Sequence, residues 1–193
     1  MSINNTLQQF EASVRKVLKD FKTNREIIDQ LQPAFQTLLN TKGLLPEHYK
    51  KPKSEKYSQF LLYKPQDEAF SIVAFIWGPG QTAPIHDHLV WGLVGIYEGK
   101  IEETRYRKVA HNNEEEFRLE IIETVVAKEN DISFVYPPNT DIHSVRNPFD
   151  EPAITIHVYG TDIGKQKRNL YKNESFNKST IVTAHENEEA IYH

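Results

Sequence analysis

The stretch GQTAPIHDHLVWGLVGIYEGK, residues 80–100, places His86 and His88 two positions apart in a run dominated by apolar residues and glycines. Residues two apart in a β-strand point to the same face, so both imidazoles can face one point inside a barrel while Asp87 points away. This H-x-H pattern suits two ligands of one metal ion. Pairs of histidines also occur on solvated strand faces without a metal, so the pattern alone leaves both interpretations open.

Most of the chain beyond the first quarter is rich in short runs of aromatic and β-branched residues, which are typical of strands. Turn-like segments such as GPGQ, HNNEEE and PPNTD separate these runs. Closely spaced short strands of this kind favour a sandwich or a barrel over alternating strands and helices. We expect strands at residues 59–64, 69–78, 84–92, 93–108 with a bend at Gly99, 117–128, 132–137, 143–147 and 153–160.

Two helices are expected before the strands. Residues 5–22 carry apolar side chains at three- and four-residue steps, the period of an amphipathic helix. A second helical pattern begins near Thr23 or Asn24, which are suitable N-caps, and Pro33 is expected to break or kink it. We therefore predict a mainly β fold in a single domain over residues 1–193, with a helical cap at 1–50, a β-barrel at 55–172 and a polar C-terminal arm at 173–193 that is extended or partly disordered.

The composition limits the classes of partner. With 193 residues, 38% of them hydrophobic, the chain is long enough for one sizeable core. The 23 basic and 27 acidic residues are spread along the chain, so no basic stripe indicates a nucleic acid or an anionic membrane, and a small-molecule partner is expected. The chain has no cysteine, so a metal would have to be held by His, Asp or Glu. The opening residues lack the apolar core of a signal peptide and no apolar run reaches membrane-spanning length, from which we expect a soluble cytoplasmic protein.

A third histidine, His143, follows the turn PPNTD, and Gly80 and Gly99 occupy positions where a strand would enter and leave a small barrel. Together these residues resemble the two signature motifs of the cupin superfamily. The first motif supplies H-x-H and usually a glutamate, and the second supplies one further histidine. The glutamate position, four residues after His88, is Gly92 here. The resemblance implies a cupin double-stranded β-helix, also called a jelly-roll barrel, with an all-histidine site.

Three segments, PIHDHLVWGLVGIYEG, YPPNTDIHSV and ITIHVYGTDIGKQKR, are similar to the cysteine dioxygenase family, the cupins that use O2 to oxidise a small thiol to its sulfinic acid. The resemblance covers about residues 55–172. It implies a mononuclear Fe(II) held by His86, His88 and His143. Imidazoles also accept zinc, nickel, copper and manganese, so the residue types do not identify the metal by themselves.

The resemblance also implies a relay of the form Ser-x-His-x-Tyr near the metal, which here consists of Thr155, His157 and Tyr159. Alternate strand residues share a face, so these side chains can hydrogen-bond in a line, and the tyrosine hydroxyl can donate to oxygen or substrate. Threonine in place of serine keeps the hydroxyl, and we expect the hydrogen bond to survive. Taken alone, the segment AITIHVY is also compatible with an ordinary core strand.

Two positions depart from true cysteine dioxygenases, in which an arginine binds the substrate carboxylate and a cysteine crosslinks to the relay tyrosine. Gln59 stands at the arginine position, and Gly92 stands where the cysteine would fall. These departures resemble the glutamine-type branch associated with 3-mercaptopropionate dioxygenase activity. That branch binds the carboxylate through an arginine after the HVYG segment, which by position is Arg168. Without the resemblance, an arginine in GKQKRNLY would be expected to lie solvated on a surface turn.

The leading hypothesis is Fe(II)-dependent oxidation of a small thiol carboxylate by O2, with 3-mercaptopropionate favoured over L-cysteine. Tyr159, His157 and Thr155 are the expected catalytic residues, and Arg168 and Gln59 are expected to orient the substrate. Two alternatives stay open: a cupin that binds a metal or ligand without turnover, and a metal-dependent cupin enzyme with a non-thiol substrate. The histidines in polar sequence contexts, treated as bystanders, are His48, His111, His185 and His193.

Overall fold

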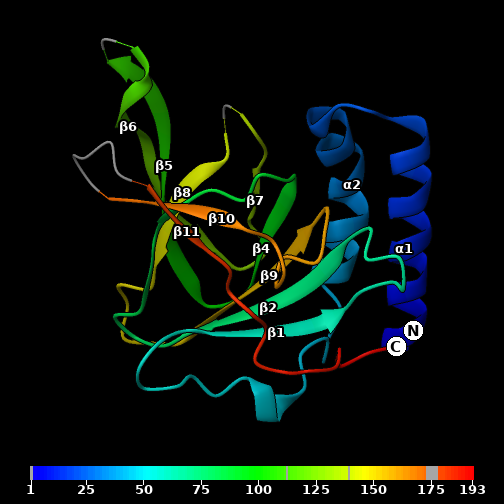
Figure 1. The fold of residues 1–193 in the computed structure, drawn as a ribbon. Coiled ribbons are helices and arrows are strands. Elements are labelled where there is room, and N and C mark those ends of the chain that lie inside the picture. The colour runs from blue at the N-terminus through cyan, green and yellow to red at the C-terminus, as the bar shows by residue number, and fades with distance from the viewer. Residues whose placement is uncertain (1, 112, 139, 173–177) are drawn as a thin grey trace.

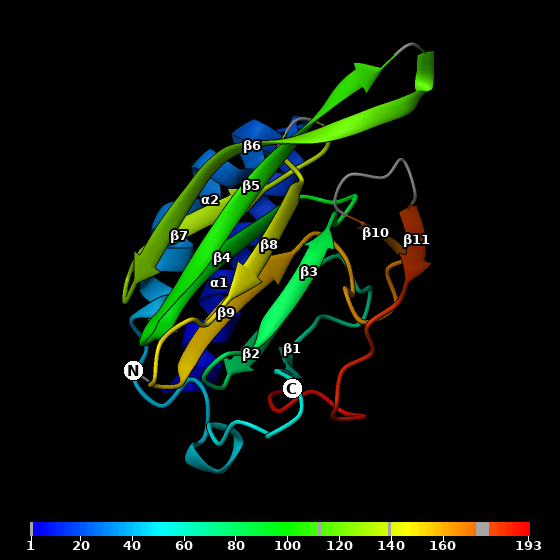
Figure 2. The same cartoon turned by 90° about the vertical axis from the view of Figure 1, so that its left-hand side faces the viewer.

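The computed structural model describes residues 2–111, 113–138, 140–172 and 178–193. These residues form two β-sheets that face each other and two N-terminal helices that lie against one of them (Figures 1 and 2). The helices are α1 (Ile3–Asp20) and α2 (Asn24–Leu39), followed by a short 3-10 helix (Glu47–Tyr49). The strands are β1 (Ser58–Tyr63), β2 (Ser71–Trp77), β3 (Thr82–His86), β4 (Gly92–Glu98), β5 (Lys100–His111), β6 (Asn113–Lys128), β7 (Ile132–Val135), β8 (Ile142–Arg146), β9 (Ala153–Tyr159), β10 (Arg168–Tyr171) and β11 (Lys178–Ile181).

Strands that are distant in the chain are neighbours in both sheets. The first sheet has the strand order β1-β2-β9-β4-β7, and the second has the order β11-β10-β3-β8-β5-β6. All the pairings are antiparallel. The chain therefore passes back and forth between the two sheets. The predicted mainly β fold, a double-stranded β-helix with two N-terminal helices, is confirmed.

Helix α2 begins as its sequence predicts and continues past its proline. Thr23 caps the helix in a capping box with Glu26. Pro33 lies inside the helix, which continues to Leu39, so of the two predicted effects the break is wrong and the kink stays a prediction. The apolar face is fully buried on both sides of the proline, at Leu31 and Phe35. This tertiary packing outweighs the loss of the one backbone hydrogen bond that a proline cannot donate.

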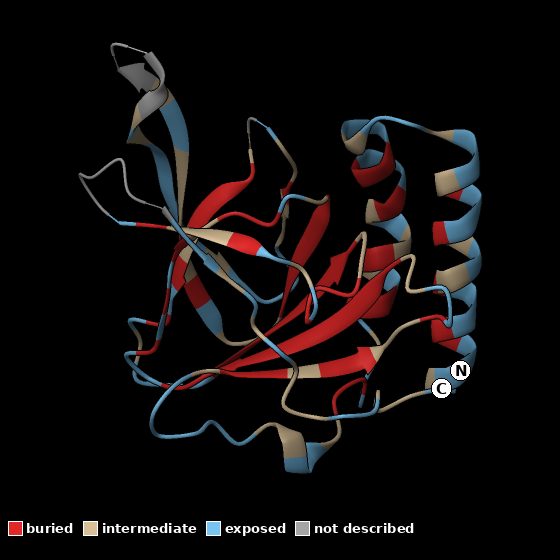
Figure 3. Cartoon of the chain, in the orientation of Figure 1, coloured by how far each residue is buried: buried red, intermediate tan, exposed pale blue. Residues whose placement is uncertain are grey.

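The helices cover the outer face of the five-stranded sheet, where α2 packs on β4 and β7 and α1 packs beside α2 (Figure 1). Strands β2 and β9 are buried along their whole length (Figure 3). Consecutive residues of β2 face opposite sides of the sheet: Ile72 packs in the cluster under the helices, and Val73 packs in the barrel interior. Neither helix, nor any other helix in the described part of the chain, is long and apolar enough to cross a membrane.

The segment between β3 and β4 differs from its prediction. The strand expected at 84–92 ends at His86, and the next strand begins only at Gly92. Leu89, between them, has a φ of 61°, a left-handed conformation that turns the chain. The bend predicted at Gly99 is confirmed, because this glycine separates β4 from β5 with a φ of 75°.

Strands β10 and β11 were not predicted, because the four-residue segments RNLY and KSTI are too short to show an alternating pattern. Strand β10 joins the six-stranded sheet beside β3, and β11 pairs with β10. The position of this pair in the sheet depends on β3, which is distant in sequence.

The C-terminal arm beyond β11 runs along β1. The amide of Glu186 donates to the carbonyl of Gln59 at 2.9 Å, and the amide of Ile191 donates to that of Leu61 at 3.1 Å. The arm is therefore held against β1 by backbone hydrogen bonds, with a strand at Lys178–Ile181 and bends at 186–189 and 191. Its predicted first part, residues 173–177, lies outside the described residues.

Helix α2 packs tightly against β4 at Gly95. An added Cβ there would lie 2.9 Å from both methyl carbons of Leu39 and 3.0 Å from the ring of Phe35. Gly95→Val is expected to lower the free energy of unfolding by about 1–3 kcal/mol through overpacking, measured by urea denaturation.

Two controls make this test specific. Ile121→Val changes a side chain that is 64% exposed and should shift the free energy of unfolding by less than about 0.5 kcal/mol. The double variant Gly95→Val/Leu39→Ala should be less destabilised than the sum of its single changes, since the smaller side chain leaves room for the new one. Strict additivity would contradict the proposed contact.

A candidate three-histidine metal centre

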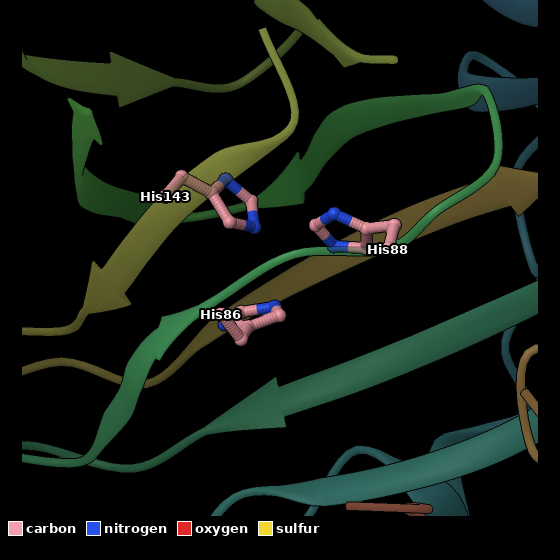
Figure 4. Close-up of side chains that lie close together, drawn as sticks. All are labelled: His86, His88 and His143. Atoms are coloured by element: carbon pink, nitrogen blue, oxygen red, sulfur yellow. The ribbon is translucent and has the colours of Figure 1, made fainter. Parts of the chain in front are cut away.

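The register of β3 and β8 brings two of the predicted ligands together. His86, the last residue of β3, lies directly opposite His143 of β8. His88 follows two residues later in the turn, so it is not on a strand as predicted, yet its ring joins the other two (Figure 4). The ring centroids are 4.8–4.9 Å apart, and one nitrogen from each ring lies within 4.8 Å of the others. The structure therefore groups His86, His88 and His143 as a set that could hold a metal ion.

Each imidazole uses its Nδ1 nitrogen for a hydrogen bond to a protein oxygen. The pairs are His86 Nδ1 with the carbonyl of Pro84 at 2.7 Å, His88 Nδ1 with the carbonyl and Oδ1 of Asp141, both at 3.3 Å, and His143 Nδ1 with Oε1 of Glu103 at 2.7 Å. Because a carbonyl or a carboxylate can only accept, Nδ1 must carry the proton in each ring. The Nε2 lone pairs are then left to bind a metal, and the oxygen partners hold the rings in place.

The electrostatics of the group also suit a metal ion. Burial is the main cause that lowers the pKa of His86 and of His88 well below the usual value, and the neighbouring imidazoles add to it. His88 is fully buried, and its Nε2 has no hydrogen-bond partner among the described residues. A neutral, unpaired nitrogen beside two others is the donor set that a divalent transition metal accepts from imidazoles.

Glu103 is a member of this site that the sequence analysis missed. Burial opposes its charge, but the hydrogen bond from His143 and the nearby charge of Arg105 outweigh this cost and lower the pKa of Glu103 to about 2. An ionised carboxylate on the outer nitrogen of a ligand histidine orients the ring and increases its basicity. The sequence offers no signal for this pair, because the two residues lie 40 positions apart.

The predicted relay forms a continuous chain of hydrogen bonds on β9. Thr155 Oγ1 lies 2.7 Å from Nε2 of His157, and Nδ1 of His157 lies 2.7 Å from the hydroxyl of Tyr159. The indole of Trp77 donates to Thr155 Oγ1 at 3.0 Å and extends the chain by one member. The expected Thr155 hydrogen bond is therefore present.

The donors and acceptors of this chain follow from Trp77, whose N–H can only donate. Thr155 accepts that bond, so its own proton is satisfied by donating to Nε2 of His157. His157, whose pKa burial lowers well below the usual value, is then neutral with its proton on Nδ1, and it donates to the oxygen of Tyr159. Burial raises the pKa of Tyr159, so the phenol keeps its proton and can donate it onward.

Tyr159 links the relay to the histidines. Its ring stacks on that of His88, with centroids 5.3 Å apart and an interplanar angle of 18°. The backbone of Gly92 packs directly against the phenol ring: a Cβ added there would be 2.7 Å from the Cδ1 atom of Tyr159. A side chain at position 92 would therefore require this ring to shift from its present position.

One cavity in the barrel joins the histidines, the relay and the predicted substrate-binding arginine. Its wall includes Tyr57, His86, His143, His157, Tyr159 and Arg168. A second cavity adjoins it and shares Tyr57, His86 and Arg168. Tyr57 was missed by the sequence analysis, although it lies two residues before Gln59.

Arg168 does not lie on a solvated turn. It begins β10, and only 5% of the residue is exposed. Its Nε has no hydrogen-bond partner, and its guanidinium forms no ion pair with an acidic side chain in the described part of the chain. A buried charge without a partner is costly, so this guanidinium is available to an anionic ligand.

Gln59 is buried on β1 but does not bound either cavity within the described residues. Its Nε2 donates to the carbonyl of Thr183 at 3.1 Å and lies 3.1 Å from Nδ1 of His185. Its Oε1 has no partner among the described residues. The structure thus gives Gln59 contacts with the C-terminal arm, and its contact with substrate stays a prediction.

Comparison with known proteins assigns the chain to a family. The family described as cysteine dioxygenase type I matches residues 2–168. Among solved structures, the chain is similar to an uncharacterised conserved protein with a double-stranded β-helix domain from Klebsiella pneumoniae subsp. pneumoniae MGH 78578, at 18% identity and a TM-score of 0.49, over 66% of this chain and 88% of that one. It is also similar to a cupin superfamily protein from Desulfitobacterium hafniense DCB-2, at 13% identity and a TM-score of 0.43, over 61% and 90% of the respective chains. The family match carries the assignment, and these distant structures add nothing about the chemistry.

We predict that the three histidines bind one divalent metal ion. His88→Ala and His143→Ala each remove a ligand and should weaken binding about 100-fold or more, and Glu103→Gln, which keeps every ligand, should weaken it about 10- to 100-fold. Anaerobic calorimetric titration with Fe(II) measures these affinities. His48→Ala, which changes a histidine outside the group, should retain the parent affinity. Equal affinities in all the variants would contradict the site.

Proposed function

Because the chain belongs to the cysteine dioxygenase type I family, we propose that it is an Fe(II)-dependent dioxygenase of a small thiol carboxylate, with 3-mercaptopropionate preferred over L-cysteine. The reaction is R–SH + O2 → R–SO2H, in which both oxygen atoms are transferred to sulfur. It needs no external reductant, since the sulfur supplies the four electrons that dioxygen takes up. The family implies the dioxygenase activity, and the choice of thiol is our proposal.

The buried guanidinium of Arg168 is the observation that carries the substrate class. It shares a cavity wall with His86 and His143, so one small molecule can contact the arginine at one end and the metal site at the other. A substrate carboxylate would give the guanidinium the anionic partner that it lacks among the described residues. The planar fork of an arginine matches a carboxylate with two parallel hydrogen bonds. The acid end of the substrate would thereby be fixed while the sulfur faces the histidines.

Tyr159 is placed to act at the sulfur end. Its proton is free to donate because its oxygen already accepts from His157. Apolar side chains on the same cavity wall, including Phe75 and Val145, exclude water and strengthen this donation. Fe(II), when bound by the histidines, supplies the one-electron chemistry that dioxygen requires together with open positions beside the imidazoles.

The cavity walls support a thiol without an amino group. Neither cavity is bounded by an aspartate or a glutamate within the described residues. The ammonium group of L-cysteine would therefore be placed near Arg168 without a carboxylate to pair with, which is unfavourable in a buried site. 3-Mercaptopropionate carries the thiol and the carboxylate and lacks this charge.

The substrate proposal predicts an order of specificity constants. For the iron-loaded protein, kcat/KM should fall in the order 3-mercaptopropionate, L-cysteine, cysteamine, and cysteamine, which has no carboxylate, should be about 10- to 100-fold below the first. Arg168→Met keeps the apolar stem and should abolish the preference for carboxylates by raising KM for the acids. Cysteamine turnover in the same variant is the internal control for folding. Oxygen consumption measures all the rates, and absence of thiol-dependent uptake by the iron-loaded parent would overturn the function.

The relay generates a separate prediction. Tyr159→Phe should lower kcat for 3-mercaptopropionate about 100-fold with little change in KM, because it removes a proton donor without touching the carboxylate clamp. Fe(II) affinity should stay at the parent value. Tyr97→Phe is the matched control, since the Tyr97 hydroxyl donates to the carbonyl of Thr41, beyond α2. An unchanged kcat in Tyr159→Phe would remove Tyr159 from the mechanism.

A further inference from the structure

The C-terminal arm forms part of the wall beside Arg168. Ile181 of β11 pairs directly with Arg168 in the β10–β11 ladder. Ile181 and Thr183 both bound the second cavity, together with Arg168 and His86. Contacts that hold residues 181–183 in place therefore also determine the shape of the cavity next to the guanidinium of Arg168.

His185, two residues after Thr183, has a largely buried side chain that contacts the barrel. Only 9% of its side chain is exposed, and its Nε2 lies 2.8 Å from Oδ1 of Asp162. The ring packs directly on Gly164, where an added Cβ would collide with it. Burial opposes the charge of Asp162, but hydrogen bonds from His185 and Lys64 outweigh that cost and hold its pKa below the usual range. A histidine treated as a bystander from its polar sequence context is thus a buried bridge between the arm and the barrel.

The direction of each hydrogen bond around His185 can be assigned. The carbonyl of Thr183 only accepts, so it fixes the Nε2 end of the Gln59 amide toward the arm. The second hydrogen of that amide then goes to Nδ1 of His185, which must be an acceptor. The imidazole proton is on Nε2 and is donated to Asp162. Both hydrogens of the Gln59 amide are therefore held by the arm.

We propose that His185 is a positioning residue for substrate binding: through its Nδ1 it holds the amide of Gln59 and, with it, residues 181–183 of the arm against the cavity beside Arg168. This inference rests on the proposed function, because it assigns a role in binding the carboxylate end of the thiol. His185 touches neither the metal ligands nor the cavity, so its effect must be transmitted through Gln59 and the arm.

Two substitutions separate this role from simple anchoring of the arm. The Oδ1 of an asparagine lies as many bonds from the backbone as Nδ1 of histidine, so His185→Asn keeps the acceptor for Gln59 and loses the bond to Asp162. A glutamine reaches as far as Nε2, so His185→Gln keeps a donor for Asp162 and loses the acceptor for Gln59. We expect His185→Gln to raise KM for 3-mercaptopropionate about fivefold or more at nearly constant kcat, and His185→Asn to stay close to the parent.

The opposite order, or equal KM values in the two variants, would overturn the proposal and assign His185 to anchoring through Asp162. A double-mutant cycle adds a second criterion. If His185 acts through Gln59, the His185→Gln change should have no further effect on KM in a Gln59→Leu background. Additive effects of the two changes would contradict the coupling.

A measurement without turnover distinguishes failure of this inference from failure of the proposed function. The side-chain amide protons of Gln59, followed by NMR, should be protected from exchange in the parent and in His185→Asn, and should exchange faster in His185→Gln. A parent that oxidises none of the thiols would overturn the proposed function, and unchanged exchange of this amide in His185→Gln would overturn the role of His185.

Discussion

The antiparallel pairing of β3 with β8 is the constraint on which the site depends. It sets His86 directly opposite His143, so imidazoles from segments more than 50 residues apart become neighbours on adjacent strands. The pairing of β8 with β5 then brings Glu103 beside His143. The turn after His86 is held by Asp141, which accepts from the amides of His88 and Leu89 at 3.1 and 2.9 Å. The same backbone pairings thus place the three rings and the groups that orient them.

The three ligand side chains carry no negative charge, and the cavity wall beside them carries a positive one. Three neutral imidazoles give a divalent metal no anionic ligand, and the nearby ionised Glu103 reaches the site only through Nδ1 of His143. The guanidinium of Arg168 adds a further positive charge to the same cavity wall. The phenol ring packs on Gly92, so a side chain at that position would require the ring to shift. The site therefore has a deficit of negative charge that a thiolate with a carboxylate would balance.

Patterns among neighbouring residues agree with the structure at several positions. The alternation of polar side chains in AITIHVY places Thr155, His157 and Tyr159 on one face, and the structure joins them by hydrogen bonds of 2.7 Å. The bend at Gly99 followed from a residue that tolerates a positive φ. The predicted break at Pro33 failed for the opposite reason, because burial of the flanking residues against the sheet overrode a local preference.

The partners that decide the chemistry were not accessible from local patterns. The strand carrying Arg168 pairs with β3 and β11 on its two sides. Its guanidinium is buried without an acidic partner among the described residues, although the local sequence is typical of a solvated turn. His185 lies in a polar segment, and its side chain contacts Gln59 and Asp162, which are 126 and 23 residues away.

The three histidines and the relay were predicted from the resemblance to a family, whereas the mainly β class and the helical cap were determined by periodicity in the sequence itself. The physical reason is that the period of a helix and the alternation of a strand are properties of consecutive residues. Only the tertiary structure decided which oxygen fixes each imidazole, that the guanidinium of Arg168 is buried without an acidic partner among the described residues, and that the arm closes one wall of the site. Hydrogen bonds and burial join residues that are distant in the chain, and they exist only after the sheets have paired.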